Sequence, residues 1–367
     1  MLFSIIVSLD NQYELITNFI ETLVIHTDLA DGELIVIADG CKNKNTLDYL
    51  EQIKLRINNF HVILSREQNG YSMANNIAVR HSKGDILVFI NSDVLVGKDS
   101  IKKLVAFLET NSSAGAVQGR LIYPQNNKIQ STGHLFIGRN NSHIYKGKPC
   151  NHPLVLKQGV RQALTTAFCA IPRTVFYSNG GFNEEYFNAY DGMELTLKIT
   201  CSGLQCVYYP DAMAYHITGA TRSYVKFNDE LAGRIFWSKW EGKIRTDIAE
   251  YIIPQITKEM WNQIYFLIDC GSLPDWDTII IDIGIAISGK IKIRDRYDKS
   301  IDLYCNLPFA ALNYNGSYLF VCDDILALNR NYNWCYVRNN PRDLVIDSHG
   351  NVEYLYSLVG IDEKIRC

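Results

Sequence analysis

The sequence predicts an α/β fold: a mostly parallel, Rossmann-like sheet flanked by helices, followed by an additional C-terminal domain that is β-rich or α+β. Two observations lead to this prediction. Short apolar, β-branched segments alternate with segments of helical spacing in the N-terminal part, as in strands joined by crossover helices. The chain also has 367 residues, more than one hydrophobic core usually supports, so we expect more than one domain.

Four apolar segments are predicted strands, and two amphipathic segments between them are predicted helices. The strands are Phe3–Val7, Glu33–Ile37, His61–Leu64 and Ile86–Ile90. The helices are Tyr13–Ile25 and Thr46–Ile57. This alternation of strand and helix indicates a parallel sheet with helices on both faces.

Polar residues follow three of the predicted strands directly, and open parallel sheets bind ligands at the carboxyl ends of their strands. These residues are Ser8, Asp10 and Asn11 after the first strand, Asp39 after the second, and Asn91, Ser92 and Asp93 after the fourth. Turns and helix caps would explain any one cluster alone. Three clusters at corresponding strand ends predict one polar crevice.

The composition excludes several classes of protein. The chain is 47% apolar and 20% charged, which is ordinary for a globular protein. Its net charge is −3 and no run of Lys or Arg stands out, so we expect no nucleic-acid partner. The ten cysteines form no C-x-x-C pair, which indicates reduced thiols and a cytoplasmic protein. No long apolar stretch predicts a transmembrane segment, so any association with the inner face of the cell membrane would be peripheral.

Two blocks of the sequence resemble the family 2 glycosyltransferases of GT-A fold. The first block places these pairs and triplets at the family's motif positions: Asn69-Gly70, Asn75-Asn76, Gly84-Asp85 and Asn91-Ser92-Asp93. The second block, Gly180–Gly219, is similar to the family's GGFDE…EDxDL…H pattern. The resemblance implies a GT-A domain at residues 1–245. It stops there, so residues 246–367 are expected to form an accessory domain for acceptor binding or for self-association into a homo-oligomer.

The resemblance implies a divalent cation, Mn²⁺ or Mg²⁺, at the end of the fourth strand. Asp93 would supply a carboxylate ligand and His216 an imidazole ligand, while Asn91 and Ser92 would line the sugar or ribose of the donor. Mg²⁺ is commonly held by one or two carboxylates plus substrate phosphates, and imidazole suits Mn²⁺. The residues alone leave two alternatives open: an Asx-capped turn at Asn91-Ser92-Asp93 and a packed or surface histidine at His216.

The donor implied is a nucleotide-diphosphate sugar, with a UDP-sugar favoured over GDP- and dTDP-sugars. Asp39 would read the base, although Ala38 replaces the first acidic residue that the family usually has there. The other donor-binding residues implied are Ser8, Asp10, Asn11, Asn69, Asn76 and Arg222. A turn cap remains an alternative for Asp39, a helix-surface amide for Asn76, and a solvated side chain for Arg222.

Transfer needs a general base that deprotonates the acceptor hydroxyl. In the segment NAYDGMEL, Gly192 occupies the place of the family's catalytic Asp. A register shift of one residue makes Asp191 the base, and Glu194, with its longer side chain, is an alternative. The D-x-x-E spacing of these two residues also resembles a helix capping box. With neither acting as base, the chain would bind a donor without efficient transfer.

We therefore expect an inverting, metal-dependent glycosyltransferase of hexosyltransferase type that acts in surface polysaccharide or glycoconjugate synthesis. Inversion is implied by the resemblance alone. The acceptor would be a hydroxyl of a glycan, a lipid-linked precursor or a protein. The alternative is a non-catalytic homologue that binds a nucleotide sugar or a glycan. A sugar nucleotidyltransferase is disfavoured because the loop after the first strand lacks the glycines of a G-x-G-T-R loop.

Overall fold

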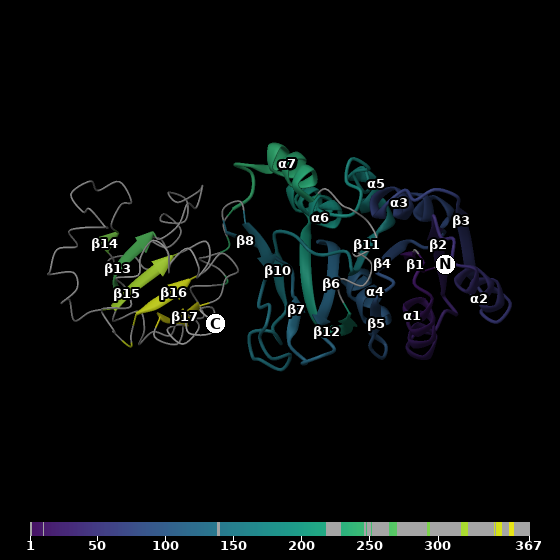
Figure 1. Cartoon of the computed structure of the whole chain (residues 1–367), viewed down its shortest axis with the longest axis horizontal. Helices are drawn as coiled ribbons and strands as arrows, with labels where there is room; N and C mark the ends of the chain where they lie inside the picture. Colours follow the sequence, from purple (N-terminus) through teal and green to yellow (C-terminus); the bar gives the residue numbers. More distant parts are fainter. Residues whose placement is uncertain are drawn as a thin grey trace, which may run out of the picture. The chain divides into compact units, whose positions relative to one another are not determined.

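The computed structural model describes two compact units of the chain. Described are residues 2–9, 11–137, 140–217, 229–245, 247, 251, 264–269, 292–293, 317–321, 341, 343–346 and 352–355. The first unit comprises Met1–His134 and His143–Trp240, and the second Leu135–Ser142 and Glu241–Cys367. Figure 1 labels their helices and strands.

A ten-stranded mixed sheet forms the centre of the first unit, in the order β10-β12-β6-β11-β4-β1-β2-β3 with β5 and β7 off this path. Its strands are β1 (Phe3–Leu9), β2 (Gly32–Asp39), β3 (Phe60–Ser65), β4 (Ile86–Ile90), β5 (Val94–Val96), β6 (Ala114–Ile122), β7 (Ile129–Ser131), β10 (Gly159–Arg161), β11 (Phe168–Pro172) and β12 (Gln205–His216). The pairs among β1 to β4 are parallel, as is β6 with β12, whereas β11 runs antiparallel between β4 and β6. The carboxyl ends of the parallel strands therefore meet at one edge.

Helices cover both faces of this sheet (Figure 1). They are α1 (Tyr13–His26), α2 (Lys44–Lys54), α3 (Tyr71–His81), α4 (Ser100–Thr110), α5 (Arg173–Ser178), α6 (Asp191–Cys201) and α7 (Asp229–Trp240). One core joins α1, α2 and α4 to alternate strand residues such as Ile5 and Val88. The other core joins α3, α5 and α6 to the residues between them, such as Ile6 and Phe89. The alternation follows from the two-residue period of a strand.

Phe89 illustrates how closely the second core is packed. Its ring lies 5.0 Å from Phe182 and 5.5 Å from Phe176, measured between centroids, and its side chain is fully buried. Truncating a buried phenylalanine of this kind costs about 3–5 kcal/mol. Phe176 lies in α5 and Phe182 in the segment between α5 and α6, so this packing fixes both against β4.

The four predicted strands and two predicted helices are confirmed, with differences at their ends. The helix predicted to end at Ile57 ends at Lys54. It begins at Lys44 because the Asn43 side chain accepts hydrogen bonds from the amides of Asn45 and Thr46, which satisfies two of the unpaired amides of the first turn. The parallel sheet between helix layers is thus present as expected.

The second unit contains a five-stranded sheet in the order β14-β13-β15-β16-β17. These strands are β13 (Ile264–Asp269), β14 (Lys292–Ile293), β15 (Ser317–Val321), β16 (Leu344–Ile346) and β17 (Val352–Tyr354). The short strands β8 (His134–Ile137) and β9 (Asn140–His143) pair with each other. Most of residues 246–367 lie outside the described residues, so the class of that domain stays a prediction. Among the described helices, none has the length and apolar character that a bilayer crossing requires.

Candidate active site

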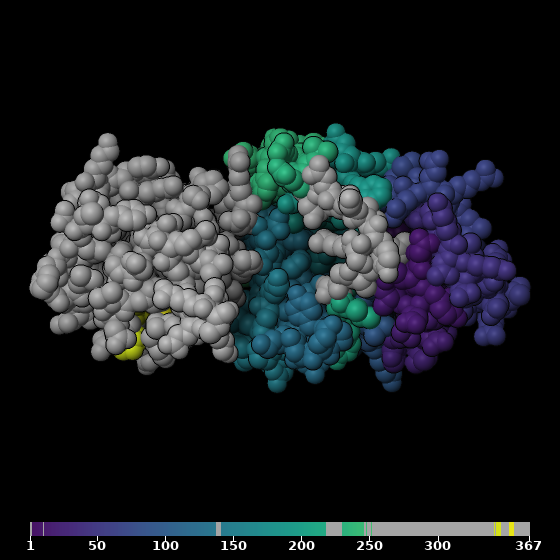
Figure 2. Space-filling model, viewed as in Figure 1, coloured from purple at the N-terminus to yellow at the C-terminus, as the bar shows by residue number. Residues whose placement is uncertain are grey.

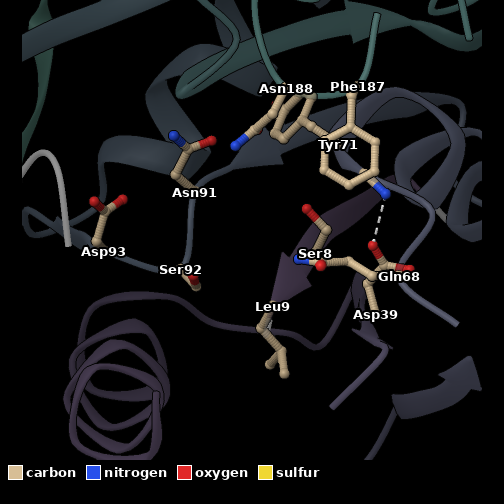
Figure 3. A pocket seen from close by; sticks show the side chains of 11 residues that line it. Ser8, Leu9, Asp39, Gln68, Tyr71, Asn91, Ser92, Asp93, Phe187 and Asn188 are labelled. Atoms are coloured by element: carbon tan, nitrogen blue, oxygen red, sulfur yellow. Dashed lines mark hydrogen bonds between the residues drawn. The ribbon is translucent and has the colours of Figure 1, made fainter. Parts of the chain in front are cut away.

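A cavity of about 80 Å³ opens where β1, β2 and β4 end, at the edge where the sequence predicted a polar crevice (Figure 3). Its lining combines polar side chains of these strand ends with residues of the loops before α3 and α6. The lining residues are Ser8, Leu9, Asp39, Gln68, Gly70, Tyr71, Asn91, Ser92, Asp93, Phe187 and Asn188. The three predicted clusters therefore do converge on one site.

Asp93, which lines the cavity, faces His216, which is not among the lining residues. Asp93 Oδ1 lies 3.1 Å from His216 Nε2 and accepts no hydrogen bond, and both side chains are buried. They meet because β5 pairs antiparallel with the end of β12, which sets His216 opposite Val94. The Ile217 amide also donates to the Asp93 carbonyl at 3.0 Å.

A cation fits between these two side chains. His216 Nδ1 lies 2.8 Å from Gln130 Oε1, so with this oxygen as acceptor Nδ1 carries the hydrogen and Nε2 of a neutral imidazole presents a lone pair. In that state two acceptor atoms lie 3.1 Å apart, a separation that allows both of them to bind one cation. Among the described residues no third His, Cys, Asp or Glu joins this pair in a metal-binding group. A metal ion here would take further ligands from a bound substrate or water.

Asn91 and Ser92 line the cavity from the turn after β4. The Asn91 amide donates to the Ala167 carbonyl at 3.1 Å, and its own carbonyl accepts from the Val94 amide at 3.1 Å. Asn91 Oδ1 is buried without a hydrogen-bond donor. A buried acceptor with no partner costs free energy, so this atom is suited to a donor group on a ligand.

Asp39 lines the cavity, but its carboxylate already accepts several hydrogen bonds. Oδ1 accepts from the Asn69 amide at 2.9 Å and from Asn69 Nδ2 at 2.7 Å, and Oδ2 accepts from the Gly70 amide at 2.9 Å. Asn69 Nδ2 also reaches Ser65 Oγ at 2.7 Å, and Asn69 is not among the lining residues. Asp39 therefore fixes the loop before α3, and Asn69 supports the cavity wall from behind.

Of the three residues predicted after β1, Ser8 lines the cavity and accepts from Asn75 Nδ2 at 3.3 Å. Asn11 is absent from the lining. Its Oδ1 accepts from the Lys42 and Asn43 amides at 2.6 and 3.0 Å, which joins the loop after β1 to the loop after β2. Asp10 lies outside the described residues, as does the predicted diphosphate clamp Arg222.

Asn76 connects the two motif blocks instead of lining the cavity. Its Nδ2 donates to the Phe182 carbonyl and to Glu184 Oε1, both at 2.9 Å, while its Oδ1 accepts from the Phe182 amide at 3.1 Å. Because all these hydrogen bonds go to the segment before α6, the side-chain amide of Asn76 holds that segment in position. Asn75, one residue earlier, is the member of the pair that reaches the cavity wall.

The start of α6 holds both candidate bases. The N-cap is Tyr190, in the left-handed region and without a side-chain capping bond, so the alternative of a capping box with Asp191 as the cap is wrong. Asp191 Oδ1 accepts from the Gly192 amide at 2.6 Å. A Cβ at Gly192 would stand 2.3 Å from Thr166 Oγ1, so the family's aspartate does not fit there with Thr166 in place.

Glu194 is buried in this helix and its carboxylate has protein partners. Oε2 accepts from Asn183 Nδ2 at 3.1 Å, and Oε1 lies 3.3 Å from Lys198 Nζ. Neither Glu194 nor its two partners line the cavity, and Asp191 is absent from the lining as well. These contacts are those of a residue that holds the segment before α6 to the helix.

Sequence reasoning missed Gln68, Tyr71, Phe187 and Asn188, which complete the cavity lining. The Tyr71 amide donates to the Phe187 carbonyl at 2.6 Å, and Figure 3 shows both aromatic side chains on the same side of the cavity. Burial, and next the charge of Asp191, raise the pKa of the Tyr71 hydroxyl above its usual range. Asp191 thus acts electrostatically on a side chain of the cavity wall.

Comparison with known proteins agrees with this geometry. Residues 4–176 match the Glycosyl transferase family 2 model. The chain carries a family 2 glycosyltransferase domain. The matched residues end within α5. His216 and the start of α6 therefore lie beyond the match.

The relatives that match this chain are longer proteins. It is 30% identical over 230 residues to an uncharacterized protein of Sinorhizobium fredii, a match that covers 61% of the chain and 25% of the relative. It is 25% identical over 228 residues to an O-antigen biosynthesis protein of Myxococcus xanthus, covering 60% of the chain and 17% of that protein. The chain therefore spans about a quarter or less of the length of these relatives.

One solved structure extends the fold comparison beyond the family 2 match. The crystal structure of residues 1–349 of Staphylococcus aureus TarS in complex with UDP-GlcNAc aligns with a TM-score of 0.50 at 16% sequence identity. The alignment covers 67% of this chain and 68% of that one. At this identity the likeness establishes the fold, a GT-A-like sheet flanked by helices.

Proposed function

We propose that this chain is an inverting glycosyltransferase that moves a hexosyl group from a UDP-sugar to a hydroxyl acceptor with the aid of Mn²⁺ or Mg²⁺. The observation that carries the proposal is the pair of facing acceptor atoms on Asp93 and His216, 3.1 Å apart at the edge of a polar cavity. The family 2 domain and the UDP-GlcNAc bound to a protein of the same fold support the donor class.

Asp93 and His216 would hold the divalent cation together with oxygens of the donor diphosphate. Such an ion would neutralise the charge that develops on the leaving diphosphate. Asn91 Oδ1, buried and without a donor, would accept a hydrogen bond from a sugar or ribose hydroxyl. Ser8 and Ser92 would line the same ligand, and Asp39 would keep the loop of Asn69 and Gly70 in place around the base.

Asp191 is the base we propose, in preference to Glu194. The carboxylate of Glu194 is engaged by Asn183 and Lys198, whereas the charge of Asp191 acts on Tyr71, a residue of the cavity wall. A positioned carboxylate that accepts the acceptor proton contributes about 10²–10⁴-fold in rate. Inversion itself rests on the family resemblance.

The biological setting follows from the relatives and is part of the proposal. The Myxococcus xanthus relative is named for O-antigen biosynthesis, which supports a glycan or lipid-linked acceptor in surface polysaccharide synthesis at the cytoplasmic side of the membrane. We further propose that residues 1–245 form the transferase domain. Residues 246–367 would then form an accessory domain for acceptor binding or self-association.

Thermal unfolding with UDP, GDP, CDP and dTDP, each with and without Mn²⁺, tests the proposal. A ligand at about 100 times its Kd adds about 2.7 kcal/mol of stability, enough to raise the midpoint by a few degrees in a chain of this size. We expect a shift with UDP that requires Mn²⁺ and is lost in Asp93→Ala and His216→Ala. The exposed His81→Ala should leave it unchanged. If no nucleotide moves the midpoint, the donor assignment is wrong.

A non-catalytic, donor-binding role is the second candidate, favoured by Gly192. The structure leaves no space there for the family's aspartate beside Thr166. Release of UDP from UDP-GlcNAc in the presence of Mn²⁺ separates the two functions. Turnover that Asp191→Asn abolishes supports the enzyme, and UDP binding without any turnover, whatever the acceptor, supports the binding role.

A further inference from the structure

Acidic residues are missing from a long stretch in the middle of the chain. No Asp or Glu occurs between Glu109 and Glu184, although the chain has 39 of them, and this stretch contains eight Lys or Arg. The net charge of −3 therefore conceals a strong separation of charge along the sequence. The basic residues are spaced apart, so no run of them appears.

The central part of this stretch, residues 123–134 and 143–158 and named here the basic segment, packs against the carboxyl ends of β6 and β12. Its strand β7 pairs with β6, with Ile129 opposite Ile122. A small apolar cluster of Ile122, Ile129 and Val155 joins it to Met213 and Tyr215 of β12. The next residue of β12 is His216, which faces Asp93. The basic segment is thus built onto the strand that carries half of the candidate metal site.

Three lysines of the basic segment lie close together in the chain's fold. Lys128 forms a β-bridge with Pro149, and the Ile129 amide donates to the Lys148 carbonyl at 2.8 Å, while Lys146 lies in the same turn. Lys128 and Lys146 are exposed and Lys148 is half-buried. Within the described part of the chain, no carboxylate forms an ion pair with any of the three. Figure 2 shows this blue-to-teal part of the chain at the surface.

His143 lies within electrostatic range of both Lys146 and the candidate metal site. The ring of His143 lies 4.9 Å from that of His134, between centroids. Burial, and then the charges of His134, Lys146 and His216, lower the pKa of His143 well below its usual value. The charges of both Lys146, on the surface, and His216, which faces Asp93, therefore act on His143.

We propose that the basic segment is the acceptor-binding surface, and that the acceptor is a polyhydroxyl chain carrying repeated anionic groups, phosphate or carboxylate. The inference rests on the proposed function, since it names the acceptor of that transfer. Cations without carboxylate partners attract such a chain along the surface. Their position beside His216 brings a hydroxyl of the chain toward the donor. A neutral glycan would gain nothing from this surface.

Binding of the full chain to three soluble polymers tests the proposal: a poly(glycerol phosphate) oligomer, a hyaluronan oligosaccharide and a dextran oligomer of similar length. We expect binding of the two anionic polymers, weakened about tenfold or more between about 50 and about 300 mM NaCl by screening, and none of dextran. Comparing the affinities for poly(glycerol phosphate) and for hyaluronan shows whether the surface prefers phosphate or carboxylate groups. Replacing the lysines together, by Lys128→Gln, Lys146→Gln and Lys148→Gln, should weaken binding about tenfold.

The matched control is Lys54→Gln with Lys102→Gln, which removes exposed lysines of α2 and α4 and should leave binding unchanged. Equal affinity for dextran, or anionic binding that the triple variant retains, overturns the proposal. Equal affinity for phosphatidylglycerol vesicles or for a single-stranded oligonucleotide of similar charge also overturns it, because the surface would then recognise charge without regard to the glycan. The Mn²⁺-dependent UDP shift is measured on the same variants. If the UDP shift is absent while the polymers still bind, the proposed transferase function is wrong, but the assignment of the basic segment as a binding surface for anionic polymers remains.

Discussion

Gly192 at the start of α6 lies against Thr166, so closely that a Cβ on Gly192 would stand 2.3 Å from the threonine hydroxyl oxygen. The same hydroxyl accepts a hydrogen bond from the Tyr71 hydroxyl at 3.0 Å, and Tyr71 lines the cavity. Thr166 therefore connects the helix that carries Asp191 to the wall of the candidate donor site.

This contact predicts that Gly192→Ala destabilises the protein by about 1–3 kcal/mol, the usual cost of overpacking a buried site. Thr166→Ala removes both the hydroxyl and the methyl group nearest to the new Cβ, so the double variant should recover part of the loss. Urea unfolding of the two single variants and the double variant gives a coupling energy, which we expect to exceed about 0.5 kcal/mol. Strictly additive effects would show that the two residues do not compete for the same space.

The two candidate bases predict different outcomes on mutation. Asp191→Asn should lower the rate of sugar transfer by about 10²–10⁴-fold and leave the UDP-dependent thermal shift intact. Glu194→Gln weakens the contacts with Asn183 and Lys198, so we expect a loss of stability of about 1–3 kcal/mol with a transfer rate close to that of the original protein. The reverse pattern, with transfer lost in Glu194→Gln only, would identify Glu194 as the base.

Asp39→Asn should destabilise the loop before α3. The amide that replaces one carboxylate oxygen would place a donor against the amides of Asn69 or Gly70, and the charge-assisted bonds lost are worth about 1.5–3 kcal/mol. We expect a lower free energy of unfolding and weaker UDP binding. Asp48→Asn, on the exposed face of α2, is the control and should change stability by less than about 0.5 kcal/mol. Equal effects of the two changes would show that the Asp39 contacts contribute little.

The lowered pKa of His143 predicts that the protein loses stability in mild acid. Its pKa is lower in the folded protein than the usual value, so the folded state binds fewer protons than the unfolded state. The resulting contribution is complete above about pH 6.5, the usual pKa of histidine, and is lost as pH falls below it toward the folded value. Between about pH 7 and pH 5, urea unfolding should show a smaller decrease for His143→Gln than for the original protein. His81→Gln, at an exposed position of α3, should retain the full decrease.

The sheet and the position of the site could be predicted because both follow from simple periodicity. Buried strands such as Ile86–Ile90 read as continuous apolar segments, and the rule that ligands bind at the carboxyl ends of parallel strands placed Ser8, Asp39 and Asp93 together before any geometry was known. The pairing of Asp93 with His216 needed the family resemblance as well, because 122 residues separate them along the chain.

The roles of the motif amides could not be predicted, because a sequence does not tell which polar atoms are used up by the loops themselves. Asn11, Asn69 and Asn76 are predicted donor-binding residues, yet their side chains bind neighbouring segments and do not line the cavity. Phe187 and Asn188 reach the cavity through the path of an irregular loop, for which residue spacing carries no signal. Gly192 was recognised as a departure, but its partner Thr166 lies in another segment.

The bond between the Tyr71 amide and the Phe187 carbonyl, 2.6 Å long, has a consequence for how this protein can evolve. It joins main-chain atoms, and the two segments come this close because Gly70 has no side chain: a Cβ there would clash with the Phe187 carbonyl oxygen. The cavity wall therefore keeps its place whatever side chains occupy positions 187 and 188. Substitutions at these two positions therefore give evolution a way to change the side chains that face the cavity while the main-chain bond still joins the two segments.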